Sequence, residues 1–230
     1  CMLFSPDGRK LLMGQPNSAL LLDVATGLVQ GKLFEPGRAR VRDAAFSPDG
    51  STAACVWGSA RVTLSLWNVW TGAIVKIAPA TFTGQEMAPT EGTRLPNWAG
   101  PAYSVAFSPD GTLLAIGSLN CRTVLVDTAT WEVRQVLAWP MVKEPNLYGC
   151  VCALAFSPDG KTLASAIDRT AVVLWDLAKG QPSRILDGHQ EPIKALLFSP
   201  DGTRLSVGAE DFTLALWRLD ADHAPPVRMD

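Results

Sequence analysis

The chain has 230 residues, of which 47% are hydrophobic and 18% are charged, a composition that favours a folded globular chain and excludes an intrinsically disordered one. Its 20 basic residues are balanced by 22 acidic ones and form no block of like charge, which argues against a nucleic-acid partner. The apolar runs, such as Ala171 to Trp175, are strand-sized and shorter than the roughly 20 residues that cross a bilayer, so we expect no membrane partner.

One short motif recurs along the whole chain. Phe-Ser-Pro-Asp-Gly occurs five times, with successive copies 42, 61, 49 and 42 residues apart. The copies begin at Phe4, Phe46, Phe107, Phe156 and Phe198. A period near 42 is typical of four-stranded units of about 40 to 45 residues, and the two longer spacings indicate expanded loops between units.

The same pattern of strands repeats inside each unit. An apolar strand runs into the Phe, and Ser-Pro-Asp-Gly then forms a tight turn, because Pro presets φ near −65° and Gly accepts a positive φ. A second apolar strand and a third strand follow, and Thr-Gly or Lys-Gly turns the chain into a fourth. The third strand ends in Leu-Trp at 66–67, 174–175 and 216–217, and in the shorter forms Leu-Leu-Asp at 21–23 and Leu-Val-Asp at 125–127.

These residues resemble the WD-repeat β-propeller family, through the five Phe-Ser-Pro-Asp-Gly copies, Leu-Trp-Asp at 174–176 and the pair Gly188 and His189. The resemblance extends over nearly the whole chain. It implies an all-β fold, a β-propeller of four-stranded antiparallel blades with five repeats. Such a fold carries many unrelated functions, so the resemblance is far more specific for structure than for activity.

We expect one propeller domain over 1–220, followed by a polar, Pro-containing tail at 221–230. The last repeat is predicted to have three strands, since Pro225 and Pro226 cannot donate ladder hydrogen bonds. With 19 strands in place of 20, the ring is predicted to be open or incomplete, as part of a larger propeller such as one with seven blades; the alternative is a five-bladed ring that closes imperfectly. The repeats lie near 1–36, 37–78, 102–139, 150–187 and 188–219, with insertions at 79–101 and 140–149.

The resemblance also implies a buried polar network within some blades, made by a His, a Ser or Thr, an Asp and the third-strand Trp. The last repeat offers His189, Asp211 and Trp217, although Val207 stands where the hydroxyl belongs. The fourth repeat offers Ser165, Asp168 and Trp175 without a His. The first and third repeats lack the strand Trp, with Leu22 and Val126 in its place, so we expect dry, apolar interiors in these two blades and polar interiors in the last two.

The two insertions flank the third blade on one face and carry aromatic residues, Met and a cation, which is typical of a protein-binding hot spot. Alternatively, the longer insertion folds back and buries its own aromatics. Trp98 occupies the family's His position, which favours a structural role, whereas Trp139 favours partner contact; Arg40 and Arg61 form a basic rim or a solvated face. The candidate binding residues are Phe82, Met87, Trp98, Trp139, Lys143, Tyr148, Arg40 and Arg61.

The sequence offers no candidate for catalysis, for a metal or for a cofactor. It has only two histidines and lacks a Gly-x-Ser-x-Gly elbow and a Gly-rich phosphate loop, so we expect no enzymatic activity. Cys150 and Cys152 share one face of a strand, but two thiolates do not complete a tetrahedral site, and we interpret both as small core residues. Five scattered cysteines favour a reducing, cytoplasmic compartment, although the start at Cys1 looks truncated.

The function predicted from these features is a non-catalytic interaction scaffold that presents a rigid propeller surface to a protein or peptide. Further blades of a parent chain are a second possible partner. The alternative is an accessory sensory or regulatory module of a longer enzyme or kinase, because the repeats resemble those of bacterial propellers joined to such domains. An enzyme that uses the central channel would need converging acids, histidines or a metal, which the sequence does not provide.

Overall fold

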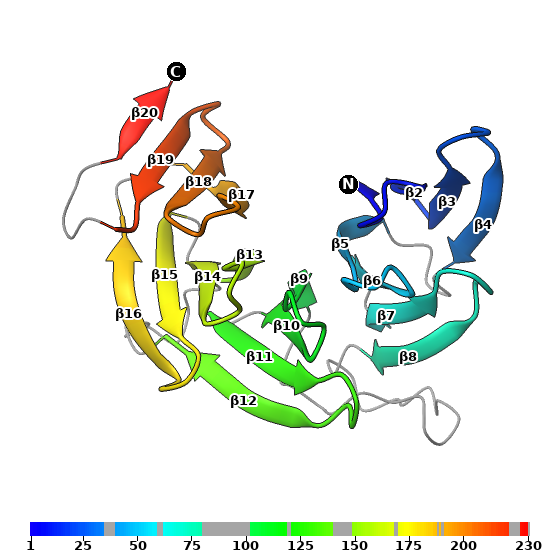
Figure 1. The fold of residues 1–230 in the computed structure, drawn as a ribbon, viewed down its shortest axis with the longest axis horizontal. Coiled ribbons are helices and arrows are strands. Elements are labelled where there is room, and N and C mark those ends of the chain that lie inside the picture. The colour runs from blue at the N-terminus through cyan, green and yellow to red at the C-terminus, as the bar shows by residue number, and fades with distance from the viewer. Residues whose placement is uncertain are drawn as a thin grey trace.

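The computed structural model describes residues 1–34, 40–58, 62–79, 102–118, 121–139, 149–167, 170–187, 189, 191–220 and 226–229. Within these ranges the chain forms twenty strands and no helix (Figure 1). The strands build five separate four-stranded antiparallel sheets, each from consecutive strands. The predicted all-β architecture of four-stranded blades is therefore confirmed.

The five sheets, here called blades 1 to 5, follow the chain in order. Blade 1 contains β1 (Met2–Phe4), β2 (Lys10–Gln15), β3 (Ser18–Asp23) and β4 (Val29–Phe34). Blade 2 contains β5 (Val41–Phe46), β6 (Thr52–Trp57), β7 (Val62–Asn68) and β8 (Ile74–Pro79). Blade 3 contains β9 (Ala102–Phe107), β10 (Leu113–Ser118), β11 (Arg122–Asp127) and β12 (Val133–Ala138). Blade 4 contains β13 (Val151–Phe156), β14 (Thr162–Ile167), β15 (Ala171–Asp176) and β16 (Gln181–Leu186), and blade 5 contains β17 (Ile193–Phe198), β18 (Arg204–Ala209), β19 (Leu214–Arg218) and β20 (Val227–Met229).

The blades stand side by side in an open arc whose two ends are blade 1 and blade 5 (Figure 1). The first strand of each blade lies on the inner side of the arc, where β5, β9, β13 and β17 contact one another in succession. The prediction of three strands in blade 5 is wrong. The chain resumes pairing directly after Pro226, because the next residue has an N–H to donate, and Val227 to Met229 pair with Leu216 to Leu214 of β19.

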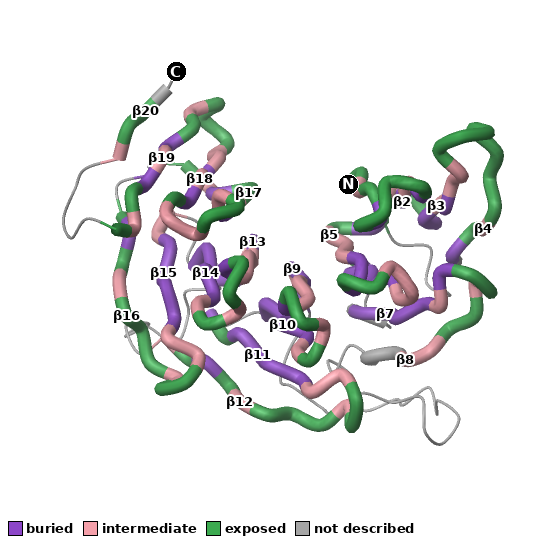
Figure 2. Tube along the Cα trace, viewed as in Figure 1, coloured by how far each residue is buried: buried purple, intermediate pink, exposed green. Residues whose placement is uncertain are grey.

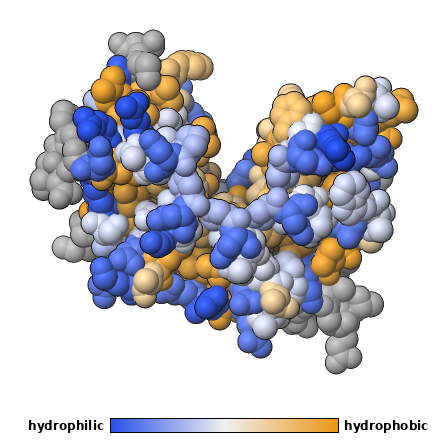
Figure 3. Space-filling model, in the orientation of Figure 1, coloured by the Kyte–Doolittle hydropathy of each residue, from blue (hydrophilic) through white to orange (hydrophobic). Residues whose placement is uncertain are grey.

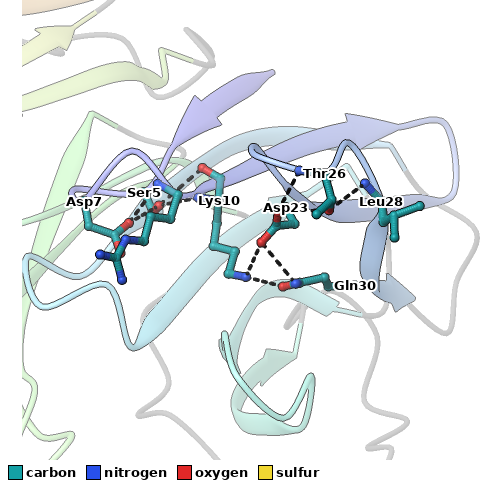
Figure 4. A network of polar contacts seen from close by, with 8 residues as sticks. Ser5, Asp7, Lys10, Asp23, Thr26, Leu28 and Gln30 are labelled. Atoms are coloured by element: carbon teal, nitrogen blue, oxygen red, sulfur yellow. Dashed lines mark hydrogen bonds and ion pairs between the residues drawn. The ribbon is translucent and has the colours of Figure 1, made fainter.

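The Ser-Pro-Asp-Gly turn has the same hydrogen bonds in all five blades, as blade 1 illustrates (Figure 4). Ser5 Oγ donates to Asp7 Oδ1 over 2.7 Å and accepts the Lys10 N–H over 2.8 Å, so one hydroxyl joins the turn to the second strand. Asp7 Oδ1 also accepts the Arg9 N–H over 3.0 Å. These bonds hold the pKa of the Asp7 carboxyl below its ordinary value. Gly8 completes the turn with φ +69°, a conformation that glycine adopts without steric cost.

Four apolar clusters lie between consecutive blades and form the core. Leu12 and Leu21 of blade 1, for example, share a cluster with Cys55 and Trp67 of blade 2. Figure 2 shows the buried residues in the middle strands of each blade, whereas the outermost strands β12 and β16 are mostly exposed. Each inner blade therefore uses one face to contact the blade before it and the other to contact the blade after it.

The outward faces of the two end blades have no described neighbour. In blade 5 the face that contacts blade 4 is formed by two register pairs, Leu205 with Trp217 and Val207 with Ala215. In blade 1 the equivalent pairs, at the same positions relative to the Phe-Ser-Pro-Asp-Gly motif, are Leu11 with Leu22 and Met13 with Leu20.

All four of these blade 1 side chains remain partly exposed. At the other end of the arc, Leu197 is 69% exposed and Val227 is 59% exposed. The space-filling view shows the notch between these two ends (Figure 3). The arc therefore presents one apolar sheet face at each end.

Candidate binding surface

A β-bulge near the start of the first strand is repeated in four blades. The pairing register shifts across Val41/Asp43 in blade 2, Val151/Ala153 in blade 4 and Ile193/Ala195 in blade 5. In blade 3 the consecutive residues Gly117 and Ser118 of β10 pair with Ser104 and Ala102, so Tyr103 of β9 is skipped in the same way. Because a bulge inserts one unpaired residue, it re-aims that side chain. The inserted residues, each four positions before the motif Phe, are Arg42, Tyr103, Cys152 and Lys194; we call them the bulge ring.

The bulge ring lines a cavity of about 930 Å³ on the inner side of the arc. All five blades contribute to its wall, with Leu3 from blade 1 and Leu154 from blade 4 among the apolar residues. Arg40, Cys150 and Glu210 add further polar or polarizable groups. The cavity lies where the connections from one blade reach the first strand of the next. The insertions that carry most of the predicted binding residues are connections of this kind.

Charged side chains in the ring are held by neighbours. The Arg42 guanidinium lies over the Tyr103 ring, with 4.5 Å between the guanidinium carbon and the ring centroid. Lys194 Nζ forms an ion pair with Glu210 Oε1 at 2.6 Å. Arg40 is exposed at the rim of the same cavity. The wall therefore carries three cationic groups against one exposed carboxylate, that of Glu210.

A second carboxyl, that of Asp43, sits behind the ring and links two blades. Asp43 Oδ2 accepts the Val105 N–H of blade 3 over 2.9 Å, and Oδ1 accepts the Ala44 N–H over 2.9 Å. Burial nevertheless raises the pKa of the Asp43 carboxyl to about 6, against the lowering effect of both N–H donors. The group therefore titrates in a range where an ordinary aspartate is fully ionised.

Most residues of the predicted hot spot lie outside the described residues. Of the eight candidates, only Arg40 and Trp139 are described, and Arg40 does line the cavity. The six others stay predictions: Phe82, Met87, Trp98, Lys143, Tyr148 and Arg61.

Trp139 is described as well, and its expected role in partner contact stays a prediction. The Trp139 ring packs edge-on against Trp175, with 6.4 Å between centroids and 87° between planes, and it is half-buried beside an apolar cluster. An aromatic pair of this geometry stabilises the boundary between blades 3 and 4.

The polar networks expected in the last two blades are not formed among the described residues. His189 Nε2, Trp217 Nε1 and Trp175 Nε1 are buried without a hydrogen-bond partner there. The Asp211 carboxylate instead accepts the backbone and hydroxyl donors of Thr213, at 3.0 and 2.6 Å, because a turn aspartate satisfies its own loop first.

Burial lowers the pKa of His189, with Arg228 acting in the same direction and Asp211 against it. In the fourth blade Ser165 Oγ lies 3.3 Å from Thr123 Oγ1, and Asp168 falls outside the described residues.

A polar network is present in blade 2, for which the sequence made no prediction. Trp57 Nε1 donates to Ser65 Oγ over 2.6 Å and Trp67 Nε1 donates to the same oxygen over 2.5 Å. Ser65 is 1% exposed. It lies on the third strand, opposite Cys55, so a search for a hydroxyl on the second strand does not find it.

The cysteine pair of blade 4 also differs from expectation. Cys150 is buried, as expected of a small core residue, but Cys152 is partly exposed and both line the cavity. Their Sγ atoms lie 2.6 Å apart. Among the described residues no group of three or more His, Cys, Asp or Glu side chains is arranged to hold a metal ion.

Comparison with known families agrees with this architecture. The family model described as WD domain, G-beta repeat matches residues 92–127, 143–176 and 180–218. The last matched segment runs from β16 of blade 4 to β19 of blade 5, so the sequence repeat is offset by one strand from the blade. Blades 1 and 2 repeat the same strand order and the same turn.

The chain belongs to the WD-repeat family. WD40 repeats are generally protein-interaction scaffolds and are generally non-catalytic. No curated protein matches the chain. The described part of the WD-repeat chain contains no helix that is long and apolar enough to cross a membrane.

An alignment of the repeats on the motif Phe reveals the bulge ring in the four repeats that extend far enough before that Phe. Four positions before that Phe, the repeats have Arg42, Tyr103, Cys152 and Lys194, whereas the motif residues are the same in every copy. A position that holds large, charged or reactive side chains in a strand whose other positions are mostly small or apolar indicates a side chain outside the core.

Proposed function

We propose that this WD-repeat chain is a non-catalytic interaction scaffold whose cavity binds an acidic peptide segment of a partner protein. The observation that carries the proposal is the bulge ring, which aims side chains from four blades into one cavity. Since the ring residues sit on paired strands, they lose little freedom when a ligand binds. A concave site with a few polar groups on an apolar wall is also the usual form of a binding pocket.

The charge of the wall favours a carboxylate-rich ligand. Arg40 and Arg42 have no carboxylate ion pair in the described part of the chain, whereas Lys194 is paired with Glu210. Arginine binds carboxylates through two parallel N–H donors, and Tyr103 keeps the Arg42 guanidinium in place. An acidic segment therefore satisfies two cations that have no carboxylate partner among the described residues.

Fluorescence polarisation with labelled octaglutamate tests this proposal, with labelled octalysine as the charge-reversed probe. We expect octaglutamate to bind with an affinity that falls as salt rises, and octalysine not to bind. The variant Arg40→Ala combined with Arg42→Ala is expected to weaken binding at least tenfold. The matched control combines Arg134→Ala and Arg184→Ala, on the outer strands β12 and β16, which removes the same two positive charges outside the cavity. Equal binding by the control and the cavity variant overturns the proposal.

We propose in addition that the insertions at 79–101 and 140–149 extend this surface, with Phe82, Met87, Trp98, Lys143 and Tyr148 as contact residues. Their support is their position, because both insertions precede the first strand of a blade that lines the cavity. Pulldown from a lysate with the intact chain and with a chain lacking residues 80–100 tests the proposal. We expect the shortened chain to keep its unfolding midpoint and to lose the captured partner.

We propose that the apolar end faces of blades 1 and 5 are covered by further blades of the same kind. The support is the repeated use of equivalent residue pairs at each boundary between blades. Small-angle scattering of the isolated chain tests whether those faces are available. An open arc is the expected shape, and a closed disc would show that the two ends cover each other.

A further inference from the structure

Cys150 and Cys152 lie in a local geometry that favours a bond between their sulfur atoms. Residues two apart on an extended strand have Cα atoms about 6.6 to 6.8 Å apart, near the upper limit of about 6.8 Å for a disulfide. Here Cys152 is the inserted residue of the bulge between Val151 and Ala153, and a bulge bends its strand. The two Sγ atoms lie 2.6 Å apart. Because an S–S bond is about 2.0 Å long, bond formation requires only a small movement.

The surroundings of the pair make it accessible to a reactant. Cys152 is partly exposed and both cysteines line the cavity of about 930 Å³. Three cationic residues, Arg40, Arg42 and Lys194, line the same cavity, and positive charge favours a thiolate and an anionic reactant. In contrast, Cys55 and Cys121 are 0% exposed.

We propose that Cys150 and Cys152 form a reversible dithiol–disulfide pair that reacts with glutathione disulfide. The more exposed Cys152 thiolate attacks one sulfur of glutathione disulfide, which forms a mixed disulfide and releases one glutathione thiolate. The Cys150 thiolate then attacks the Cys152 sulfur and displaces the second glutathione. The protein loses two electrons and two protons, which reduce glutathione disulfide to two glutathione thiols. This property is independent of the proposed peptide binding.

Mass spectrometry after thiol trapping tests the proposal on the whole chain. The chain is equilibrated in glutathione buffers of varied redox ratio, quenched in acid, and alkylated after denaturation. Trypsin cleavage after Lys143 and Lys161 gives one peptide, 144–161, that contains both cysteines and no other. In the oxidised form we expect this peptide to carry no alkyl group and to weigh 2 Da less than the unalkylated dithiol peptide. The ratio of disulfide to dithiol should rise tenfold when the concentration ratio of glutathione disulfide to the square of glutathione rises tenfold.

Single variants distinguish a disulfide from separate modification of two thiols. In Cys152→Ala and Cys150→Ala one thiol of the pair is removed, so an internal 150–152 disulfide is impossible and we expect the oxidised product of these variants to carry glutathione. Cys55, in its own peptide, serves as the internal control and should stay reduced. If the wild-type peptide keeps both alkyl groups at every ratio, carries glutathione in place of an internal bond, or is oxidised no more than Cys55, the proposal is wrong.

Discussion

The Arg42 guanidinium stacks on the Tyr103 ring at 4.5 Å and thereby joins the bulge of blade 2 to that of blade 3. Both residues are the inserted members of their bulges, so neither belongs to the regular pairing of its strand. The contact orders a long cationic side chain at the cavity wall. Blades 2 and 3 therefore contact each other through this cation–π pair as well as through their shared apolar cluster.

This contact predicts a measurable coupling between the two residues. A double-mutant cycle with Arg42→Ala and Tyr103→Ala, measured by urea unfolding, should give a coupling free energy of about 0.5 to 1 kcal/mol, the magnitude of a cation–π contact at an exposed site. The pair Lys10 and Trp70, 5.8 Å apart, is a longer contact of the same kind and should couple more weakly. Additive effects at the first pair would contradict the prediction.

The raised pKa of Asp43 predicts that stability falls between about pH 4 and pH 6. Burial holds that pKa at about 6, above the ordinary value of 3.8, so in this window the folded chain keeps a proton that the unfolded chain releases. The free energy of unfolding therefore decreases as pH rises, by at most about 3 kcal/mol.

The variant Asp43→Asn tests the assignment of this slope to Asp43. Its amide oxygen still accepts a backbone N–H, and it does not titrate. We expect the variant to lose this part of the pH dependence and to be more stable than wild type at pH 7. Urea denaturation curves for both proteins from pH 4 to pH 7 provide the measurement. If the unfolding free energy of the variant changes with pH as steeply as that of wild type, the effect does not come from Asp43.

Gly117 and Gly208 occupy the same position in blades 3 and 5, yet they should respond oppositely to Ala. A Cβ on Gly117 would lie 2.8 Å from Val151 Cβ and clash with Ser104 Oγ, whereas a Cβ on Gly208 meets only Ala195 at 3.8 Å. We expect Gly117→Ala to destabilise by about 1 to 3 kcal/mol through overpacking. Gly208→Ala should be neutral or stabilise by about 0.5 to 1 kcal/mol, since Gly weakens a strand. Thermal unfolding of both variants decides between these outcomes.

Ser65 is expected to be the most sensitive polar residue of the core. Its replacement by Ala leaves the Trp57 and Trp67 indole N–H groups buried without their acceptor, at a cost of about 1 to 3 kcal/mol each. Ser165→Ala is the matched control, because Ser165 is equally buried but, among the described residues, its hydroxyl contacts the Thr123 hydroxyl at 3.3 Å and accepts from no indole. Equal losses of unfolding free energy in the two variants would argue against the shared indole acceptor.

The amino-acid sequence was sufficient to predict nineteen of the twenty strands, the turns and the grouping into blades. The reason is local: Pro and Gly set the dihedrals of each Ser-Pro-Asp-Gly turn, and the alternating apolar residues specify which strand face is buried. Gly8 and Gly202, in the first and last copies, have φ values of +69° and +71°, as the motif alone predicts.

The tertiary structure was needed for every feature that depends on neighbours far apart in the chain. Arg42 and Tyr103 meet because two bulges face each other across a blade boundary, and strand patterns do not reveal a bulge. Ser65, and not a second-strand hydroxyl, became the acceptor for two indoles because its side chain points between Trp57 and Trp67. Side-chain direction at such positions is determined by packing between blades, which local residue preferences do not specify.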